Sequence, residues 1–293
     1  MSTQFSARRD HALFKRYPLD AQVAINGETL TSPYQIYDGT MLLIGGTVDA
    51  GVASRLLTKE GLTPMRDDAG RVLAAVWVCD FTDANLGPHH ELQISLFASF
   101  QPTAPVDSHP FALIRALLLN PDMRMVCHGL WNSTERVVGY NRAHLRLNAH
   151  VTRSVVERGD DRWSFRFDEE GGGPILDGAV DVAAAPSPAV MWNLLRHIGW
   201  RGFWRTIRSP IIQTPVVNTR SAFSDETLVA NTGARSDRQV LRLFGPQDHV
   251  RIHHPLYAPL DFAPTFVQRN EGVRFVYLRP QSDADYRAEM LGR

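Results

Sequence analysis

Apolar residues recur along this chain in short runs and alternations rather than in long amphipathic repeats. The runs at 40–47 and 71–79 are typical of buried strands, and 91–97 alternates apolar and polar residues as a half-buried strand does. The same patterns predict further strands at 123–128, 137–147, 162–167, 180–182, 240–243 and 273–278. Because Gly and Pro interrupt these runs frequently, the sequence predicts a mainly β fold of barrel or sandwich type.

Helical periodicity is confined to a few segments. A short helix is expected over 49–57, and a stronger one over 189–198, which Gly199 interrupts before an aromatic and arginine-rich stretch at 200–208. This stretch has two interpretations, a lipid-facing surface element or a helix that caps an open barrel with its aromatic side chains buried. Its short length and its two glycines favour the second. Residues 1–34 are expected to form a polar arm or a peripheral strand pair, and residues 35–293 one domain.

Composition is that of an ordinary globular protein, with 44% hydrophobic and 21% charged residues. The 31 basic and 31 acidic side chains give zero formal charge, which argues against nucleic acid as a partner. No segment approaches the roughly 20 apolar residues of a membrane span, and the N-terminus has no signal-like run. Cys79 and Cys127 lie in apolar stretches and are expected as buried, reduced thiols of a cytoplasmic protein.

Lysine is rare here. Lys15 and Lys59 are the two lysines of the chain, and every other basic residue is arginine. Arginine stays charged and does not form imines, so amine chemistry has at most two candidates. Both lysines stand in polar sequence contexts, and both are expected on the surface.

Three ordered segments carry a family resemblance. They are DFTDANLGPHHELQIS at 80–95, VCHGLWNSTERVVGYNRAHLRL at 126–147 and YAPLDFAP at 257–264. Together they are similar to the acetoacetate-decarboxylase-like superfamily over roughly residues 35–280. The resemblance implies an α+β, mainly β fold: a cone-shaped β-barrel with an interior pocket, a few short helices and assembly into homo-oligomers.

The family's Schiff-base lysine has no counterpart at the matched position. Val138-Gly139 matches the family's Val-Gly, but Tyr140 and Asn141 replace the Arg-Glu that follows. Arg146-Leu147 then stands in place of the family's Pro-Lys, and a shifted register places Asn141-Arg142 there instead. Neither register supplies an amine. The chain also has Tyr37-Asp38-Gly39 where the family places an arginine. The resemblance therefore implies chemistry other than Schiff-base decarboxylation.

Glu91 is the first candidate for catalysis, because it matches the family's active-site glutamate. Alternation places Glu91, Gln93, Ser95 and His89 on the strand face opposite Leu92, Ile94 and Leu96. If that face lines a barrel cavity, a partly desolvated carboxylate gains a raised pKa suited to general acid/base work. The pattern alone favours a solvated strand face with Glu91 as an ordinary surface charge, and it is the resemblance that favours the cavity.

Other candidates come from the first and second matched segments. His89 and His128 are expected as proton-transferring catalytic residues, and Tyr140, Arg142, Asn132 and Trp131 as substrate-binding residues, with Asn132 at the pocket mouth. The adjacent pairs His89-His90 and His253-His254 do not indicate a metal site, since successive strand residues point to opposite faces. No metal and no cofactor are expected.

The sequence therefore favours a cofactor-independent, lyase-like enzyme that acts on a small carbonyl compound by acid/base chemistry, of aldol, dehydration or cyclisation type. One alternative is a non-catalytic binding barrel, with a cavity dominated by Trp77, Trp131 and Trp192 and with Glu91 paired to an arginine. The other is a decarboxylase that uses a different residue.

Overall fold

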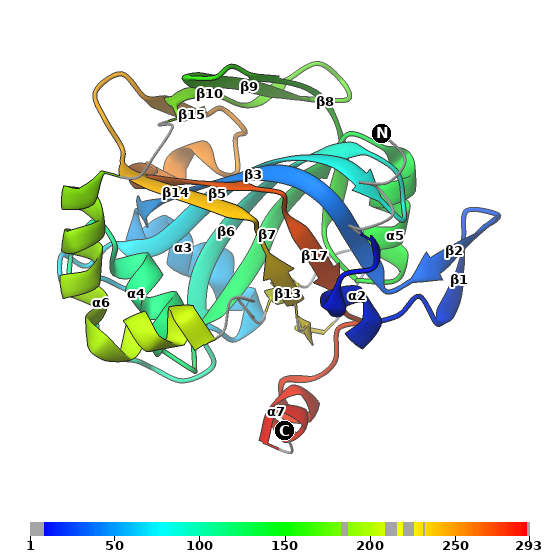
Figure 1. Cartoon of the computed structure of the whole chain (residues 1–293), viewed down its shortest axis with the longest axis horizontal. Coiled ribbons are helices and arrows are strands. Elements are labelled where there is room, and N and C mark those ends of the chain that lie inside the picture. The colour runs from blue at the N-terminus through cyan, green and yellow to red at the C-terminus, as the bar shows by residue number, and fades with distance from the viewer. Residues whose placement is uncertain (1–8, 183–186, 209–215, 219–225, 231, 292–293) are drawn as a thin grey trace.

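The structure is a computed structural model that describes residues 9–182, 187–208, 216–218, 226–230 and 232–291, with the side chains of 205–208 and 289–291 excepted. Residues 1–8 of the expected arm lie outside this description. One sheet dominates the fold (Figure 1). Its main path runs in the order β13 (Thr232–Arg235), β17 (Arg274–Tyr277), β3 (Tyr34–Val48), β5 (Val72–Ala84), β6 (His89–Ser99), β7 (Arg124–Asn132), β8 (Ala149–Arg158), β9 (Arg162–Glu169), β10 (Pro174–Asp181) and β15 (His249–Ile252).

Shorter or branching strands extend this path. They are β4 (Thr63–Pro64), β11 (Val216–Asn218), β12 (Val229–Ala230), β14 (Arg238–Leu243) and β16 (Ala263–Glu271), which pairs with β3 and β14. Among the described strands the main path is open, from β13 at one edge to β15 at the other. The expected mainly β architecture with a few helices is therefore confirmed, whereas these pairings do not trace a closed barrel.

The central strands separate two hydrophobic clusters. We call inner the face that carries Leu43, Cys79, Phe97, Cys127 and Phe266, and outer the face that carries Leu42, Val78, Leu92, Ile94 and Val126. Their alternation follows from the period of two in a strand. A Cβ at Gly45 would overlap the ring of Phe266, so this glycine allows β16 to pack its phenylalanine onto β3.

The helices divide between these two faces. On the inner face lie α4 (Ala112–Leu119) and α5 (Glu135–Ala143), whereas α3 (Ala50–Leu57) buries Ala53 and Leu57 against the outer face. Strands β8, β9, β10 and β15 form a layer at the top of Figure 1, and their apolar side chains join the outer cluster. Two short 3-10 turns follow α3 and β15, at Thr58–Glu60 and Ala258–Leu260.

The prediction of a strand over 137–147 is wrong, because this segment contains most of helix α5 (Glu135–Ala143). Glu135 occupies its first turn, and Val137, Val138, Tyr140 and Asn141 are buried, which is a helical spacing. The two adjacent valines favoured a strand by propensity, but the tertiary contacts of the buried helix face prevail.

The N-terminal segment contains the expected strand pair. Following α2 (Ala12–Arg16), strands β1 (Ala21–Ile25) and β2 (Glu28–Ser32) form a separate two-stranded sheet. This hairpin projects at the right of Figure 1, beside α5. Tyr34 then opens β3, one residue before the expected domain boundary.

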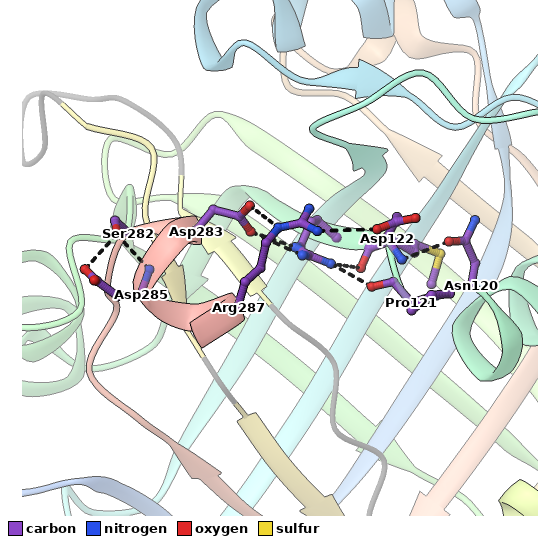
Figure 2. A network of polar contacts seen from close by, with 9 residues as sticks. Asn120, Pro121, Asp122, Ser282, Asp283, Asp285 and Arg287 are labelled. Atoms are coloured by element: carbon purple, nitrogen blue, oxygen red, sulfur yellow. Dashed lines mark hydrogen bonds and ion pairs between the residues drawn. The ribbon is translucent and has the colours of Figure 1, made fainter. Parts of the chain in front are cut away.

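The C-terminal helix α7 (Asp283–Leu291) is fixed by a buried arginine. The guanidinium of Arg124 is 2% exposed, lies 3.2 Å from the Asp283 carboxylate and donates to the Pro121 carbonyl at 3.0 Å. Asp283 also accepts from Arg287 at 2.6 Å, one helical turn later, and Arg287 reaches Asp122 at 3.6 Å. Figure 2 shows this network joining α7 to the loop before β7.

Helix α6 (Pro188–Arg208) differs from the preferred interpretation of its aromatic residues. It bends at Gly199, whose φ of 65° lies in the left-handed region. Trp192 and Trp200 are 66% and 68% exposed, so the expectation of buried aromatics is wrong for these two side chains. Ile198 is buried. No helix among the described residues is long and apolar enough to cross a bilayer.

Candidate active site on the inner face

Glu91 lies in a row of inner-face residues that crosses neighbouring strands. It is paired with Cys79 of β5 on one side and with Asn132 of β7 on the other, and Cys79 is paired in turn with Met41 of β3. Glu91 therefore lies on the inner face, where it is paired in register with the buried Cys79. Both cysteines are buried and free, and burial raises the pKa of each thiol. They are accordingly protonated, apolar neighbours of the carboxylate.

The Glu91 carboxylate has one amide donor. Its Oε2 accepts a hydrogen bond from Asn132 Nδ2 at 2.9 Å, and Oε1 has no hydrogen-bond partner among the described residues. The side chain is partly accessible, although protein surrounds it closely. Burial raises the pKa of Glu91 to about 7, and the hydrogen bond from Asn132 opposes this shift without cancelling it. The carboxyl is thus near half ionisation at neutral pH.

The side-chain amide of Asn141 holds that of Asn132 in place. Asn141 Nδ2, from α5, donates to Asn132 Oδ1 at 2.9 Å, and both side chains are buried, at 1% and 0% exposure. The Asn132 amide is thereby oriented with its nitrogen toward Glu91. Asn132 is consequently a buried anchor and not the mouth residue expected from the sequence. Asn141 was identified there only as a replacement of a family residue, with no role assigned.

The inner face beside Glu91 is packed less tightly than the outer face. Met41, Trp77, Gln93 and Gln268 are partly accessible, whereas their outer-face chain neighbours, such as Leu42 at 0%, are fully buried. Trp77, Gln93 and Gln268 lie in the adjacent row of the register, across β5, β6 and β16.

Ser95 organises the polar part of this row. Its hydroxyl accepts from Trp77 Nε1 at 3.1 Å and from Gln93 Nε2 at 2.6 Å. The expected alignment of Gln93 and Ser95 with Glu91 on one strand face is confirmed. These contacts fix the indole and the amide that border the carboxylate.

His89 shares the inner face with Glu91 but is fully enclosed. Its Nε2 lies 2.6 Å from the Tyr34 hydroxyl, and its Nδ1 lies 2.9 Å from the Gly87 carbonyl. Burial lowers the pKa of His89 to about 4, so the ring is neutral at physiological pH. With both nitrogens engaged, His89 braces Tyr34, and its expected role as a proton carrier stays a prediction.

His128 and Trp131 point away from Glu91. The His128 ring lies 2.9 Å from the Tyr257 hydroxyl, and Trp131 donates to Glu169 at 3.2 Å, both on the outer face. The register of β6 and β7 shifts between Ile94 and Ser95, which leaves His128 as an extra residue in β7. The expectation that His128 and Trp131 share a pocket with Glu91 is therefore wrong.

Tyr140 and Arg142 are separated by their positions on α5. Tyr140 is buried on the inner face, its ring 5.9 Å from that of Tyr34. Arg142 donates to the Ala149 carbonyl at 2.6 Å and lines a cleft of about 550 Å³ together with Asn26 and Arg146. Since Arg142 faces this cleft, it is not brought to Glu91, and the expected grouping of these two residues is wrong.

Both lysines are on the surface. Lys15 lies on α2 with its side chain 64% exposed and paired with Asp10 at 2.9 Å, and Lys59 is exposed in the turn after α3. Neither lies among the residues of the Glu91 row. The expectation that the two lysines are solvated is confirmed.

Comparisons with known proteins place the fold. No protein-family model and no curated sequence matches this chain. An acetoacetate decarboxylase from Legionella pneumophila subsp. pneumophila strain Philadelphia 1 superposes with a TM-score of 0.57 at 8% identity, covering 93% of this chain and 95% of that one.

Two further solved structures agree with it. A second acetoacetate decarboxylase gives a TM-score of 0.51 at 10% identity, over 85% of this chain and 87% of that one. The enduracididine biosynthesis enzyme MppR in complex with pyruvate gives 0.52 at 13%, over 87% and 91%. The sequence resemblance is thus confirmed at the level of the fold, and this chain has the fold of the acetoacetate-decarboxylase-like superfamily.

Proposed function

We propose that this chain is an enzyme that acts on a small carbonyl compound, with Glu91 as its general base and acid. In this proposal the fold closes as a cone around the inner face, and the partly accessible region at Met41, Trp77, Glu91 and Gln93 receives the substrate. The observation that carries the proposal is the carboxylate itself, which is partly accessible and has a pKa of about 7.

A carboxyl group with this pKa suits proton transfer at neutral pH. The ionised form is abundant enough to take a proton from a carbon next to a carbonyl, and the protonated form is acidic enough to return it. Asn132 engages Oε2, which leaves Oε1 as the oxygen that exchanges the proton. Taking the proton converts the carbonyl compound to an enolate. In an aldol addition or cyclisation the enolate carbon attacks a second carbonyl, and Glu91 returns the proton to the alkoxide that forms. In a dehydration the C–O bond of a β-hydroxyl breaks instead, and Glu91 gives the proton to the departing hydroxide, which leaves as water.

Schiff-base chemistry has no support from the lysines. An imine requires a reactive amine within reach of the substrate, and the two lysines of the chain are exposed far from the inner-face row in sequence and in register. The electron sink is therefore the substrate's own carbonyl group. Pyruvate is a fitting first substrate to test, since MppR, which shares the fold, was solved in complex with it.

The experiment measures exchange of the pyruvate methyl protons with deuterium from solvent, followed by NMR. Replacing Glu91 with Gln keeps the size and an acceptor for Asn132 but removes the base, so exchange should fall at least about 100-fold. Glu157→Gln, at an exposed glutamate on β8, is the matched control and should exchange as the wild type does. Unchanged exchange in Glu91→Gln removes Glu91 from the mechanism.

The binding-barrel alternative is less well supported by the site. Its three tryptophans do not converge, because Trp77 is on the inner face, Trp131 on the outer face and Trp192 on the exposed surface of α6. Glu91 is engaged by Asn132 and by no arginine among the described residues. A pure binding protein would bind pyruvate without exchange above the buffer rate, and a decarboxylase would instead release carbon dioxide from acetoacetate.

A further inference from the structure

Helix α6 has two sides of opposite character. Val190 and Leu194 pack toward the inner cluster and Ile198 is buried, while His197 stacks on His109 with ring centroids 3.8 Å apart. The side chain of Asn193 forms a further hydrogen bond, with its Oδ1 3.2 Å from Nε2 of His109. These contacts attach one side of α6 to the body of the protein and fix which side faces outward.

The outward side carries tryptophan and arginine. Trp192 and Arg196 lie one turn apart before the bend at Gly199, and Trp200, Arg201 and Trp204 lie in the first turns after it. All five side chains are exposed, and the three tryptophans are the exposed tryptophans of the described residues. An exposed cluster of large apolar side chains indicates an interaction site rather than a chance arrangement. We call these five residues the α6 face.

Charge around the α6 face has a single sign. The sequence contains no Asp or Glu from residue 182 to residue 224, whereas helix α6 in this range contains Arg196, Arg201, Arg205 and Arg208, in a chain with zero net charge. The acid that meets the anchored side of α6, Asp107, is engaged by Arg115 at 2.8 Å and by His197 at 3.5 Å. The exposed Arg196 and Arg201 therefore favour an anionic occupant of this face.

We propose that the α6 face is a docking surface for the anionic headgroup layer of a lipid bilayer. Tryptophan rings favour the boundary between headgroups and acyl chains, and arginines beside them bind anionic lipids. At the left edge of Figure 1, α6 lies on the periphery of the molecule, where a flat surface can approach it. The helix lies on the membrane and does not cross it.

Two other occupants, a single-stranded nucleic acid and a second copy of this chain, fit the α6 face less well. A single-stranded nucleic acid needs a series of open ring faces for its bases. Trp200 stacks on Phe203 at 5.4 Å and meets Trp204 edge-on at 5.1 Å, so among the described residues Trp192 is the one ring of this face that is clear of an aromatic neighbour. A second copy joined through the same face would bring the arginines of both copies into one interface, and like charges in an interface cost affinity. Insertion into an anionic headgroup layer needs no open ring faces and brings no like charges together.

Vesicle flotation tests this proposal with the full chain. Vesicles of phosphatidylglycerol and phosphatidylcholine in equal parts should carry the protein at low ionic strength, and pure phosphatidylcholine vesicles should not. Tryptophan fluorescence should shift to shorter wavelength on binding. Arg196→Gln/Arg201→Gln should weaken binding on the order of fivefold for each arginine removed. Trp200→Ser/Trp204→Ser should weaken it at least about tenfold.

The matched control is Arg153→Gln/Val155→Ser, which removes one exposed arginine and one exposed apolar side chain from β8. It should bind as the wild type does, and circular dichroism should show all variants folded. The proposal is overturned if anionic vesicles carry no protein, or if the α6 variants bind as well as the control. It is also overturned if light scattering shows a dimer that Trp200→Ser/Trp204→Ser dissociates, because the occupant is then a second copy.

Discussion

Asn132 donates a hydrogen bond to the Glu91 carboxylate across β6 and β7, at 2.9 Å, and is itself held by Asn141. This relationship sets two properties of the site. It orients one carboxylate oxygen toward the protein and leaves the other available, and it limits how far burial raises the Glu91 pKa.

The first prediction concerns the titration of Glu91. Because burial raises its pKa to about 7, a glutamate carboxyl carbon resonance should titrate near neutral pH, far above the usual range. Carbon-13 NMR of the labelled protein measures this directly, and the resonance should be missing from Glu91→Gln. The rate of pyruvate exchange should rise with the same midpoint, since the ionised form is the base. Titration of every glutamate below pH 5.5 or so would contradict the prediction.

The second prediction concerns Asn132. Its hydrogen bond stabilises the ionised carboxylate, so Asn132→Ala should move the Glu91 pKa upward from that of the wild type. The same NMR titration measures the shift, and Asn148→Ala, an amide away from Glu91, serves as the control. A Glu91 pKa that stays the same or falls would show that Asn132 does not act on the carboxylate.

The third prediction is a pH dependence of stability. The folded-state pKa of Glu91, about 7, is above its ordinary value of 4.5, so ionisation is penalised in the folded protein. The contribution of Glu91 to the stability of the wild type therefore falls as pH rises from about 4.5 through 7, and Glu91→Gln lacks this contribution. In urea unfolding, the free energy of unfolding of Glu91→Gln should rise relative to that of the wild type by on the order of 2 kcal/mol between about pH 5 and 8. A difference that is constant with pH would sink this account.

The fourth prediction concerns the α7 network of Figure 2. Asp283→Ala leaves the buried Arg124 guanidinium without its carboxylate, and this should lower the free energy of unfolding by about 3 kcal/mol. The control Asp285→Ala removes an exposed carboxylate of the same helix, which accepts from Ser282, and should cost below about 1 kcal/mol.

A second variant separates the cost of an unpaired buried charge from the cost of lost packing in this network. Adding Arg124→Leu to Asp283→Ala removes the buried cation that Asp283→Ala leaves unpaired. The double variant should therefore be more stable than Asp283→Ala alone. Equal or lower stability of the double variant would mean that Arg124 is held by the carbonyls of Pro121 and Met123 and does not depend on Asp283.

The sequence predicted those parts of the site that depend on simple alternation. Strand residues have a period of two, so the placement of Glu91, Gln93 and Ser95 on one face followed directly from the pattern. The same rule fails beyond a bulge, which is why His128 was misplaced. Trp131 and Asn132 are adjacent in β7, so at most one of them was able to share the face of Glu91.

Long-range contacts account for the other differences. The pairing of Asn141 with Asn132 depends on α5, in which the β-branched Val137 and Val138 favour a strand by local propensity. Whether α6 buries its tryptophans depends on the neighbours available to them, which periodicity does not encode. Trp192 and Trp200 lie on either side of the bend at Gly199, and both are exposed.

The most direct measurement of the central claim is methyl proton exchange of pyruvate by three proteins under identical conditions. They are the wild type, Glu91→Gln and the lysine-free variant Lys15→Arg/Lys59→Arg. If Glu91 is the base and no imine forms, the lysine-free variant exchanges at the wild-type rate and Glu91→Gln loses exchange. Loss of exchange in the lysine-free variant, with exchange retained in Glu91→Gln, would contradict this account.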